Sequence, residues 1–269
     1  MVLKGSAIVS VIKTDKWLLD AYDDPTRLCE KFVKYFDDAS ASEIHHHLTR
    51  HGMYHRPQKG GTALVKKLQH KKIWQIIQKE EEELKKRWGG PNVPIFILPA
   101  EANDRKLKRD FNGKSGLAFK DKLFLFVTEE NEEQEIKALF THEYNHVCRL
   151  GRLAKNEEDY VLLDTVILEG MAENAVRERL GDEFVAAWTA YYSDQELKKM
   201  CEKLLWPNRL IQYHHPKHED ILYGMRFYPK MAGYCMGYYL VKQYMKAKNL
   251  SCKELLDRKA ETIAQLKDG

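Results

Sequence analysis

The sequence predicts an α+β protein that is mostly helical and contains a small sheet. Apolar residues recur at spacings of three, four and seven over several stretches, which is the pattern of a helix with one face in a core. Short segments rich in β-branched and aromatic residues, bounded by glycine and proline, favour strands. The clearest helical stretches are residues 62–88, 136–151 and 160–180, and the strand segments are 93–98, 111–119 and 123–127.

The composition is that of an ordinary soluble globular protein. The chain has 269 residues, of which 43% are hydrophobic and 31% charged. No apolar run approaches the roughly eighteen residues of a membrane span, and the first residues lack the cleavage site of a signal peptide. We therefore expect a cytoplasmic protein with no membrane partner. The net charge of +4 is small and gives no reason to expect nucleic acid.

The cysteines argue against a disulfide framework and against a thiolate zinc site. They are odd in number, far apart and without a C-x-x-C pair. We expect reduced, structural thiols, with a reactive role for Cys148 as the alternative. The five are Cys29, Cys148, Cys201, Cys235 and Cys252.

The first sixty residues predict a mainly helical region. The expected elements are a strand at 7–13, a helix capped by Thr14 and Asp15, and a helix after Pro25. Gly60 and Gly61 then break regular structure. We predict that residues 1–60 pack on the core as a helical N-terminal region, and that residues 61–269 form the functional domain.

A histidine-rich segment lies inside this N-terminal region. Its density suggests metal binding, but three consecutive histidines cannot share one face of a helix or strand, and no carboxylate has a matching spacing. Surface or packing histidines are therefore the favoured interpretation, with a second metal site as the alternative, and residues 51–54 are expected to form a turn. The histidines are His45, His46, His47, His51 and His55.

The long helix predicted over residues 62–88 carries a basic cluster on its outer face. Such lysines can bind nucleic acid, but the acidic block Glu80 to Glu83 follows on the same helix and favours a solvated face. The cluster consists of Lys66, Lys67, Lys71 and Lys72.

The strand segments 111–119 and 123–127 are separated by a short polar stretch and predict a hairpin. Gly113 and Gly116 suit a strand edge that another backbone approaches closely, as a peptide substrate does in strand addition. Ordinary turn glycines are the alternative interpretation.

The pentapeptide H-E-x-x-H lies at residues 142–146. Residues four apart share one helix face, so His142 and His146 can present two imidazoles to one metal ion, with Glu143 beside them as a general base. Asn131 with the following acidic residues predicts the start of this helix, and Gly151 predicts its end.

A third ligand is expected from the helix over residues 160–180. Glu169 and Glu173 are four apart in an otherwise apolar segment, where a carboxylate is costly unless it meets a metal or a donor. We predict Glu169 as the zinc ligand and Glu173 as the acceptor of a ligand histidine N–H. Asp164 is the alternative ligand, and salt bridges without metal are a further one.

The metzincin motif H-E-x-x-H-x-x-G-x-x-H is absent. It requires glycine at 149 and histidine at 152, where this chain has Arg149 and Arg152.

Together, H-E-Y-N-H and the later E-G-M-A-E resemble gluzincin-type metallopeptidases, and more closely the YjaZ-like zinc-dependent proteases. The segments H-G-M-Y, G-K-S-G-L-A-F and A-G-Y-C-M-G-Y-Y are also similar. The resemblance implies Zn²⁺ bound by His142, His146 and Glu169, with Glu143 as base. It also implies a zincin-like metallopeptidase domain over residues 61–269, in which a small sheet packs on a backing helix and an active-site helix. Unlike thermolysin, this chain has a longer gap between the motifs, and glutamate at the position of Glu173, where that family tends to have aspartate.

The C-terminal third offers donors for the oxyanion of a tetrahedral intermediate. Helices are expected over 182–206, from Tyr228 onward and over 251–269. The resemblance favours Tyr234 as the donor, with Tyr228 next. The remaining candidates are Tyr238, Arg226 and the histidines His214, His215 and His218 of an expected polar loop.

These features favour a zinc-dependent metallopeptidase that hydrolyses peptide bonds in a peptide or protein substrate, with water activated by zinc and Glu143. The alternative is a zinc-stabilised binding or chaperone-like protein without catalysis. A metal-free helical interaction module is the third hypothesis.

Overall fold

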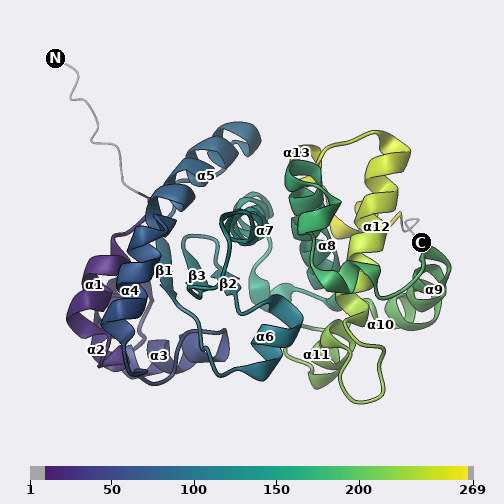
Figure 1. Ribbon diagram of the computed structural model, residues 1–269. Coiled ribbons are helices and arrows are strands. Elements are labelled where there is room, and N and C mark those ends of the chain that lie inside the picture. The colour runs from purple at the N-terminus through teal and green to yellow at the C-terminus, as the bar shows by residue number, and fades with distance from the viewer. Residues whose placement is uncertain (1–9, 266–269) are drawn as a thin grey trace. The chain divides into compact units, whose positions relative to one another are not determined.

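The computed structural model describes residues 10–265 and shows a mostly helical α+β protein with one small sheet (Figure 1). The chain divides into two compact units, Met1–Val147 and Cys148–Gly269, which we describe in turn. The functional boundary predicted between residues 60 and 61 stays a prediction.

The sheet of the first unit has three strands in the order β1-β3-β2. Strand β1 spans Ile95–Pro99, β2 spans Ser115–Ala118 and β3 spans Leu123–Val127. The two later strands pair antiparallel, which confirms the predicted hairpin, whereas β1 pairs parallel to β3. Strand β2 therefore lies at an edge of the sheet.

One face of the sheet is covered by aromatic side chains from the N-terminal helices. Phe96 and Phe124 are register partners and stack with ring centroids 4.7 Å apart. Phe32 meets both rings edge-on, at 5.1 and 5.4 Å. The covering elements are α1 (Thr14–Ala21), α2 (Pro25–Glu30), a 3-10 turn at Val33–Tyr35 and α3 (Ala41–Arg50). Burial of these rings stabilises this layer mainly through the hydrophobic effect.

Thr14 does not cap the first helix as predicted. It is the first residue of α1, and its buried hydroxyl donates to the Ile97 carbonyl of β1 at 2.5 Å. The hydroxyl therefore binds the sheet instead of capping the helix. The strand expected at 7–13 falls partly outside the described residues. Val11 within it forms a parallel bridge to Ile95.

The helix predicted over residues 62–88 is two helices, α4 (Gly61–His70) and α5 (Ile73–Trp88). Lys72 adopts a left-handed φ of 58°, which interrupts the helical hydrogen bonding. Apolar periodicity continues across the break, so the sequence pattern alone did not reveal it. The sequence patterns did not reveal helix α6 (Arg105–Phe111), which the Asp104 side chain caps and which ends inside the predicted strand segment 111–119.

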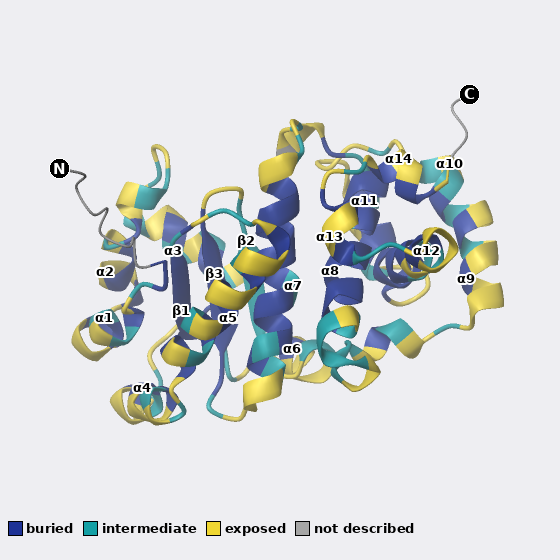
Figure 2. Ribbon diagram, turned by 90° about the horizontal axis from the view of Figure 1, so that it is seen from above, coloured by how far each residue is buried: buried dark blue, intermediate teal, exposed yellow. Residues whose placement is uncertain are grey.

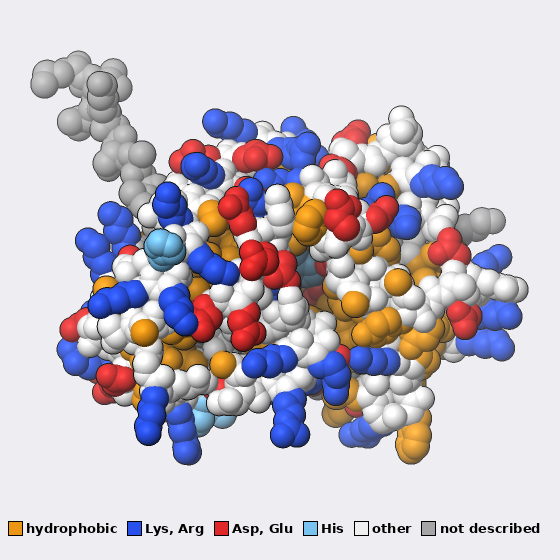
Figure 3. All heavy atoms as spheres, in the orientation of Figure 1, with side chains coloured by type: hydrophobic (Ala, Val, Ile, Leu, Met, Phe, Trp, Pro, Cys, Tyr) orange, Lys and Arg blue, Asp and Glu red, His pale blue; other side chains and the backbone are white. Residues whose placement is uncertain are grey.

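Three lysines of the basic cluster line a hollow of about 530 Å³ together with His70, Glu129 and Glu130; they are Lys66, Lys67 and Lys71. Lys67 is 2.9 Å from Glu129, and Lys71 is 3.8 Å from Glu132. On the face seen in Figure 3, basic and acidic side chains are interspersed over the surface. These ion pairs accord with the solvated face favoured from the sequence.

The second unit is built on two helices, α8 (Leu162–Leu180) and α12 (Ala232–Lys248). They approach closely at two glycines: a Cβ on Gly170 would lie 2.2 Å from the Gly237 carbonyl, and one on Gly237 would lie 1.9 Å from the Val166 carbonyl oxygen. Figure 2 shows how extensively α8 is buried. The remaining helices are α9 (Asp194–Met200), a π segment (Cys201–Leu205), α10 (Trp206–Asn208), α11 (Pro216–Tyr223), α13 (Cys252–Leu255) and α14 (Ala260–Ile263).

Several predicted boundaries in this unit are wrong. Residues 182–206 are not one helix, because 3-10 turns follow Gly181 and a capping box at Ser193 starts α9. Helix α12 begins at Ala232 rather than Tyr228, since Met231 has a left-handed φ of 55°. The tail expected as one helix over 251–269 contains two short helices, and its last four residues lie outside the described part.

The five cysteines are buried and form no disulfide, as expected for structural thiols. Among residues 10–265, no helix is long and apolar enough to cross a membrane.

Candidate metal centre

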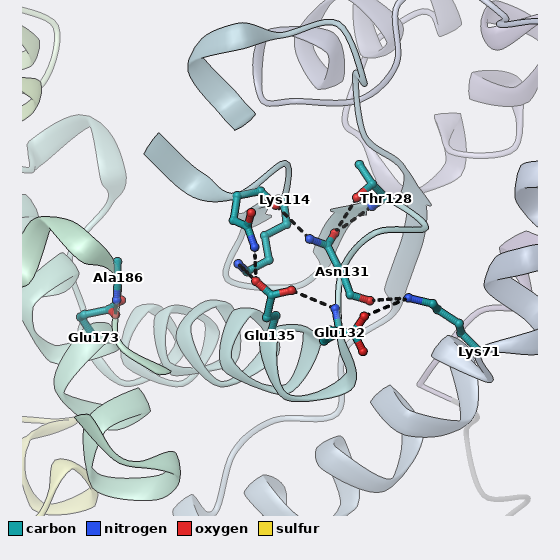
Figure 4. A network of polar contacts seen from close by, with 9 residues as sticks. Lys71, Lys114, Thr128, Asn131, Glu132, Glu135, Glu173 and Ala186 are labelled. Carbon is teal, nitrogen blue, oxygen red and sulfur yellow. Dashed lines mark hydrogen bonds and ion pairs between the residues drawn. The ribbon is translucent and has the colours of Figure 1, made fainter. Parts of the chain in front are cut away.

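Helix α7 (Glu133–Arg152) carries the H-E-x-x-H motif. Its start is fixed to the sheet by Asn131, which is buried. The Asn131 side-chain oxygen accepts from the Thr128 backbone N–H at 2.9 Å, and its amide donates to the Asn112 carbonyl at 2.9 Å (Figure 4). Asn131 is therefore a tether between the end of β3 and the end of α6, and not the helix cap predicted for it.

Glu135 adds a second tether in the first turn of α7. Its carboxylate accepts from the Glu132 backbone N–H at 2.8 Å, from Lys114 at 3.4 Å and from the Asn112 side chain (Figure 4). Burial raises the pKa of Glu135, but this backbone N–H and the Lys114 charge outweigh it and hold the pKa below its usual value. The first turn of α7, which precedes the motif, is therefore held by the three hydrogen bonds that Glu135 accepts.

The helix continues through Gly151 to Arg152, so the predicted stop at Gly151 is wrong. Nearby, Arg149 is buried and donates to the carbonyls of Leu255 and Arg258, both at 3.1 Å. This contact holds the last turn of α7 beyond the glycine. Arg149 therefore has a structural role at the position where the metzincin motif has glycine.

The two motif histidines lie one above the other on α7. Their ring centroids are 4.7 Å apart and the rings are nearly perpendicular, at 89°. His142 is half-buried and His146 is buried. Two imidazoles one turn apart on one face can present nitrogen atoms to the same ion, as the spacing predicted.

Glu143 lies against the edge strand. A Cβ on Gly116 would be 2.3 Å from the Glu143 Cγ and 2.7 Å from its Oε1. Gly116 is the register partner of Leu125, so α7 packs on the sheet face that Leu125 shares. The sequence offered a substrate backbone or a turn as reasons for this glycine, and the structure shows a further one: the Glu143 side chain occupies the space.

In the second unit, Glu169 lies on α8 and is half-buried, and its charge acts on Tyr223. The pKa of Tyr223 is raised to about 12 by burial and by the negative charge of Glu169, against a side-chain hydrogen bond with Tyr234 that lowers it. The rings of Tyr223 and Tyr234 are 5.6 Å apart. Tyr223 was missed from the sequence, because it lies on α11 outside every motif and no spacing signal links it to Glu169.

Glu173 and Asp164, the other carboxylates of α8, have structural partners. Glu173 is buried, and its Oε1 accepts from the Ala186 backbone N–H at 2.5 Å (Figure 4). Asp164 accepts from Lys155 at 2.6 Å and from the Val161 backbone N–H at 2.9 Å. Asp164 therefore caps the helix, and the role predicted for Glu173 beside a ligand histidine stays a prediction.

Tyr228 lies in the loop between α11 and α12, where its backbone N–H donates to the Met225 carbonyl at 3.2 Å. His214, His215 and His218 do not form one polar loop. His215 caps α11, and His218 is buried within that helix, 3.1 Å from the Thr165 hydroxyl. Burial lowers the pKa of His218, so it is a neutral packing side chain at pH 7.

The histidine-rich segment forms α3 and the turn after it. The rings of His47 and His51 are 4.8 Å apart, and those of His45 and His55 are 5.8 Å apart. Burial lowers the pKa of His51 to about 4 and also lowers those of His45 and His47. These ring contacts accord with the packing interpretation.

A helical histidine pair with an adjacent buried glutamate is the arrangement that the zinc-hydrolase motif H-E-x-x-H describes. The chain belongs to the family described as predicted Zn-dependent protease (DUF2268), whose model matches residues 73–265. It is similar to the uncharacterized protein YjaZ of Bacillus subtilis, with 42% identity over 95% of this chain and 98% of the relative. It is also similar to the uncharacterized protein YjfC of the same organism, with 21% identity over 70% of this chain and 64% of that protein. No solved structure matches.

Proposed function

We propose that the protein is a zinc-dependent metallopeptidase of the gluzincin type, and that His142, His146 and Glu169 bind the zinc ion. The observation that carries the proposal is the pair of imidazoles on one face of α7 with Glu143 held against the edge strand. Among the described residues, these three side chains are the group of possible metal ligands. Two nitrogens and one carboxylate oxygen are a donor set that suits zinc, with a position left for water.

A zinc ion held there would act as a Lewis acid toward the scissile carbonyl and lower the pKa of a water molecule. Glu143 supplies the base: its carboxylate accepts a proton from the attacking water and passes it to the leaving amine. Its fit against Gly116 restricts the side chain, so the carboxylate is oriented before substrate binds.

Strand β2 supports peptide as the substrate. It is the edge strand of the sheet, and an extended peptide can add to such an edge through backbone hydrogen bonds. The close packing of Glu143 on Gly116 then brings the base to the strand that holds the peptide. The packing of α7, the helix that carries the motif, against β2 also supports the zincin-like fold expected from the sequence.

Tyr234 remains our proposed oxyanion donor, with Tyr228 as the second choice. Tyr234 is buried on α12 and pairs with Tyr223, whose pKa is raised by its surroundings near Glu169. Tyr223 therefore stays protonated at pH 7, and its hydroxyl hydrogen bond can orient the Tyr234 hydroxyl toward a developing negative charge.

The test combines metal analysis with peptide hydrolysis. Protein purified without chelator is expected to contain one zinc ion per chain, and Glu143→Gln is expected to keep the zinc while activity on a broad peptide library falls by about 10²-fold or more. Glu132→Gln is the matched control, because Glu132 lies at the start of the same helix and its side chain is 80% exposed.

Protein without zinc, and with none taken up on addition, would contradict the proposal. Zinc bound without any hydrolysis that depends on Glu143 would instead support the alternative, a zinc-stabilised binding or chaperone-like protein.

A further inference from the structure

The loop of residues 224–231, between α11 and α12, presents the most exposed large apolar side chain of the described residues. Phe227 has a relative exposure of 101%, and Met225 is also exposed. Figure 3 shows hydrophobic side chains gathered over the helices of this second unit. Exposed apolar side chains that gather on one surface mark interaction sites, which single scattered ones do not.

This loop is closed by its own backbone. The Met231 N–H donates to the Tyr223 carbonyl at 3.0 Å, and the Met225 N–H donates to the Asp220 carbonyl at 2.8 Å. At the base, a Cβ on Gly224 would lie 2.0 Å from the Pro229 carbonyl oxygen, and the glycine has a φ of 69°. Phe227 is therefore held outward by an ordered loop.

The two ends of the loop join the helices that carry Tyr223 and Tyr234. Helix α11 ends at Tyr223, and α12 begins at Ala232 and carries Tyr234 in its first turn. The charge of Glu169 acts on Tyr223, which is hydrogen-bonded to Tyr234. Within the second unit, the exposed loop therefore begins directly after Tyr223, the residue on which the charge of Glu169 acts.

The charges on this loop all have one sign. Residues 224–231 contain Arg226 and Lys230 and no acidic residue. The Arg226 side chain is 69% exposed, and its Nε lies 3.3 Å from Asp220. Lys230 lies over the ring of Tyr191, 5.1 Å from its centroid, and Tyr191 is itself exposed. Aromatic and basic groups therefore adjoin on one surface.

We propose that the 224–231 loop binds the peptide substrate and selects a bulky apolar side chain flanked by acidic residues. Phe227 and Met225 contact the apolar side chain, while Arg226 and Lys230 attract the neighbouring carboxylates. The proposal rests on the proposed function. Peptide is favoured as the partner because the loop begins next to Tyr223, on which the charge of the proposed zinc ligand Glu169 acts.

Binding is measured in the Glu143→Gln background, which separates it from turnover. The probes are fluorescein-labelled alanine decapeptides with a central glutamate-phenylalanine-glutamate, and two variants in which the phenylalanine is serine or the glutamates are lysines. Phe227→Ser is expected to weaken binding of the first peptide about tenfold, the change expected for losing part of a buried apolar contact. Lys230→Gln is expected to weaken it about threefold, and less so at high salt.

Leu210→Ser is the matched control, because Leu210 is an apolar side chain of the same unit that is 66% exposed but lies outside the loop. Leu210→Ser should leave binding within twofold of the parent. Because Leu210 and Phe227 are both exposed, neither substitution should change the thermal unfolding midpoint. In the parent with Glu143 intact, Phe227→Ser should raise KM and leave kcat within twofold.

Hydrolysis that depends on Glu143, but with unchanged KM and peptide affinity in Phe227→Ser, would overturn the loop proposal and leave the proposed function standing. Loss of binding to vesicles containing phosphatidylserine, with peptide affinity unchanged, would overturn it in favour of a membrane surface. If the parent neither binds nor hydrolyses any peptide, both proposals are wrong.

Discussion

The two helices that carry the candidate ligands are positioned by different physical means. Helix α7 is held at its start by directional polar contacts from Asn131 and Glu135, and packs on the sheet where Gly116 leaves room for Glu143. Helix α8 is held by close backbone packing, with Gly170 against Gly237. The hydrogen bonds of a polar tether can be removed one at a time, whereas a close contact between two glycines leaves no room for an added side-chain atom. The two ligand helices should therefore respond differently to mutation.

Gly116→Ala should produce the largest functional effect. The added methyl group would overlap the Glu143 side chain and displace its carboxylate, and a displacement of about 1 Å can cost on the order of 10²-fold in activity. Zinc content should be unchanged, since no proposed ligand is touched. Ser115→Ala, the preceding strand residue, is the control; equal losses of activity in the two variants would contradict a specific effect on Glu143.

Gly170→Ala should destabilise the second unit. Its Cβ would lie 2.2 Å from the Gly237 backbone, an overpacking that costs about 1–3 kcal/mol. The same substitution at Gly151, an exposed position within α7, should stabilise by up to about 1 kcal/mol because alanine favours helix. Urea unfolding of both variants measures this, and a similar sign at both positions would refute the close-contact account.

Asn131→Ala tests the polar tether of α7. It removes the partners of the Thr128 backbone N–H and the Asn112 carbonyl, for an expected loss of about 1–3 kcal/mol. Asn103→Ala, at an exposed position, should change stability by less than about 0.5 kcal/mol. Urea unfolding again gives the values. If the two substitutions prove equally mild, the tether contributes little.

Glu135→Gln should give the smallest effect, seen only as a change in pH dependence. The folded state lowers the pKa of Glu135, so its contribution to stability is present above its ordinary pKa and is lost as pH falls through the lower folded value. The wild type should therefore lose more stability on acidification below about pH 4.5 than the variant does. Unfolding midpoints measured from pH 3 to 7 decide this, and parallel curves would show that Glu135 does not contribute.

Local patterns predicted much of what lies within single elements. The helix that bears His142 and His146, the β2–β3 hairpin and the end of α8 at Gly181 follow from periodicity and from glycine signals. These features depend on residues close together in the chain, where spacing determines which side chains share a face.

Tertiary contacts determined the features that the patterns did not show. Nothing near Thr14 in sequence indicates that its hydroxyl binds the Ile97 carbonyl, and nothing near Tyr223 indicates its place beside Glu169. The break at Lys72 was hidden because apolar periodicity continues across it. The contacts of Thr14 and Tyr223 involve partners distant in the chain, and local propensity cannot encode them.

The bare backbone at Gly116 has a consequence for how substrates would be distinguished. Opposite Glu143 the edge strand offers hydrogen-bonding groups but no side chain, so a bound peptide would meet the same surface there whatever its sequence. Discrimination must then arise elsewhere on the binding surface. Redesign of selectivity should start with the exposed Phe227 and should leave position 116 untouched.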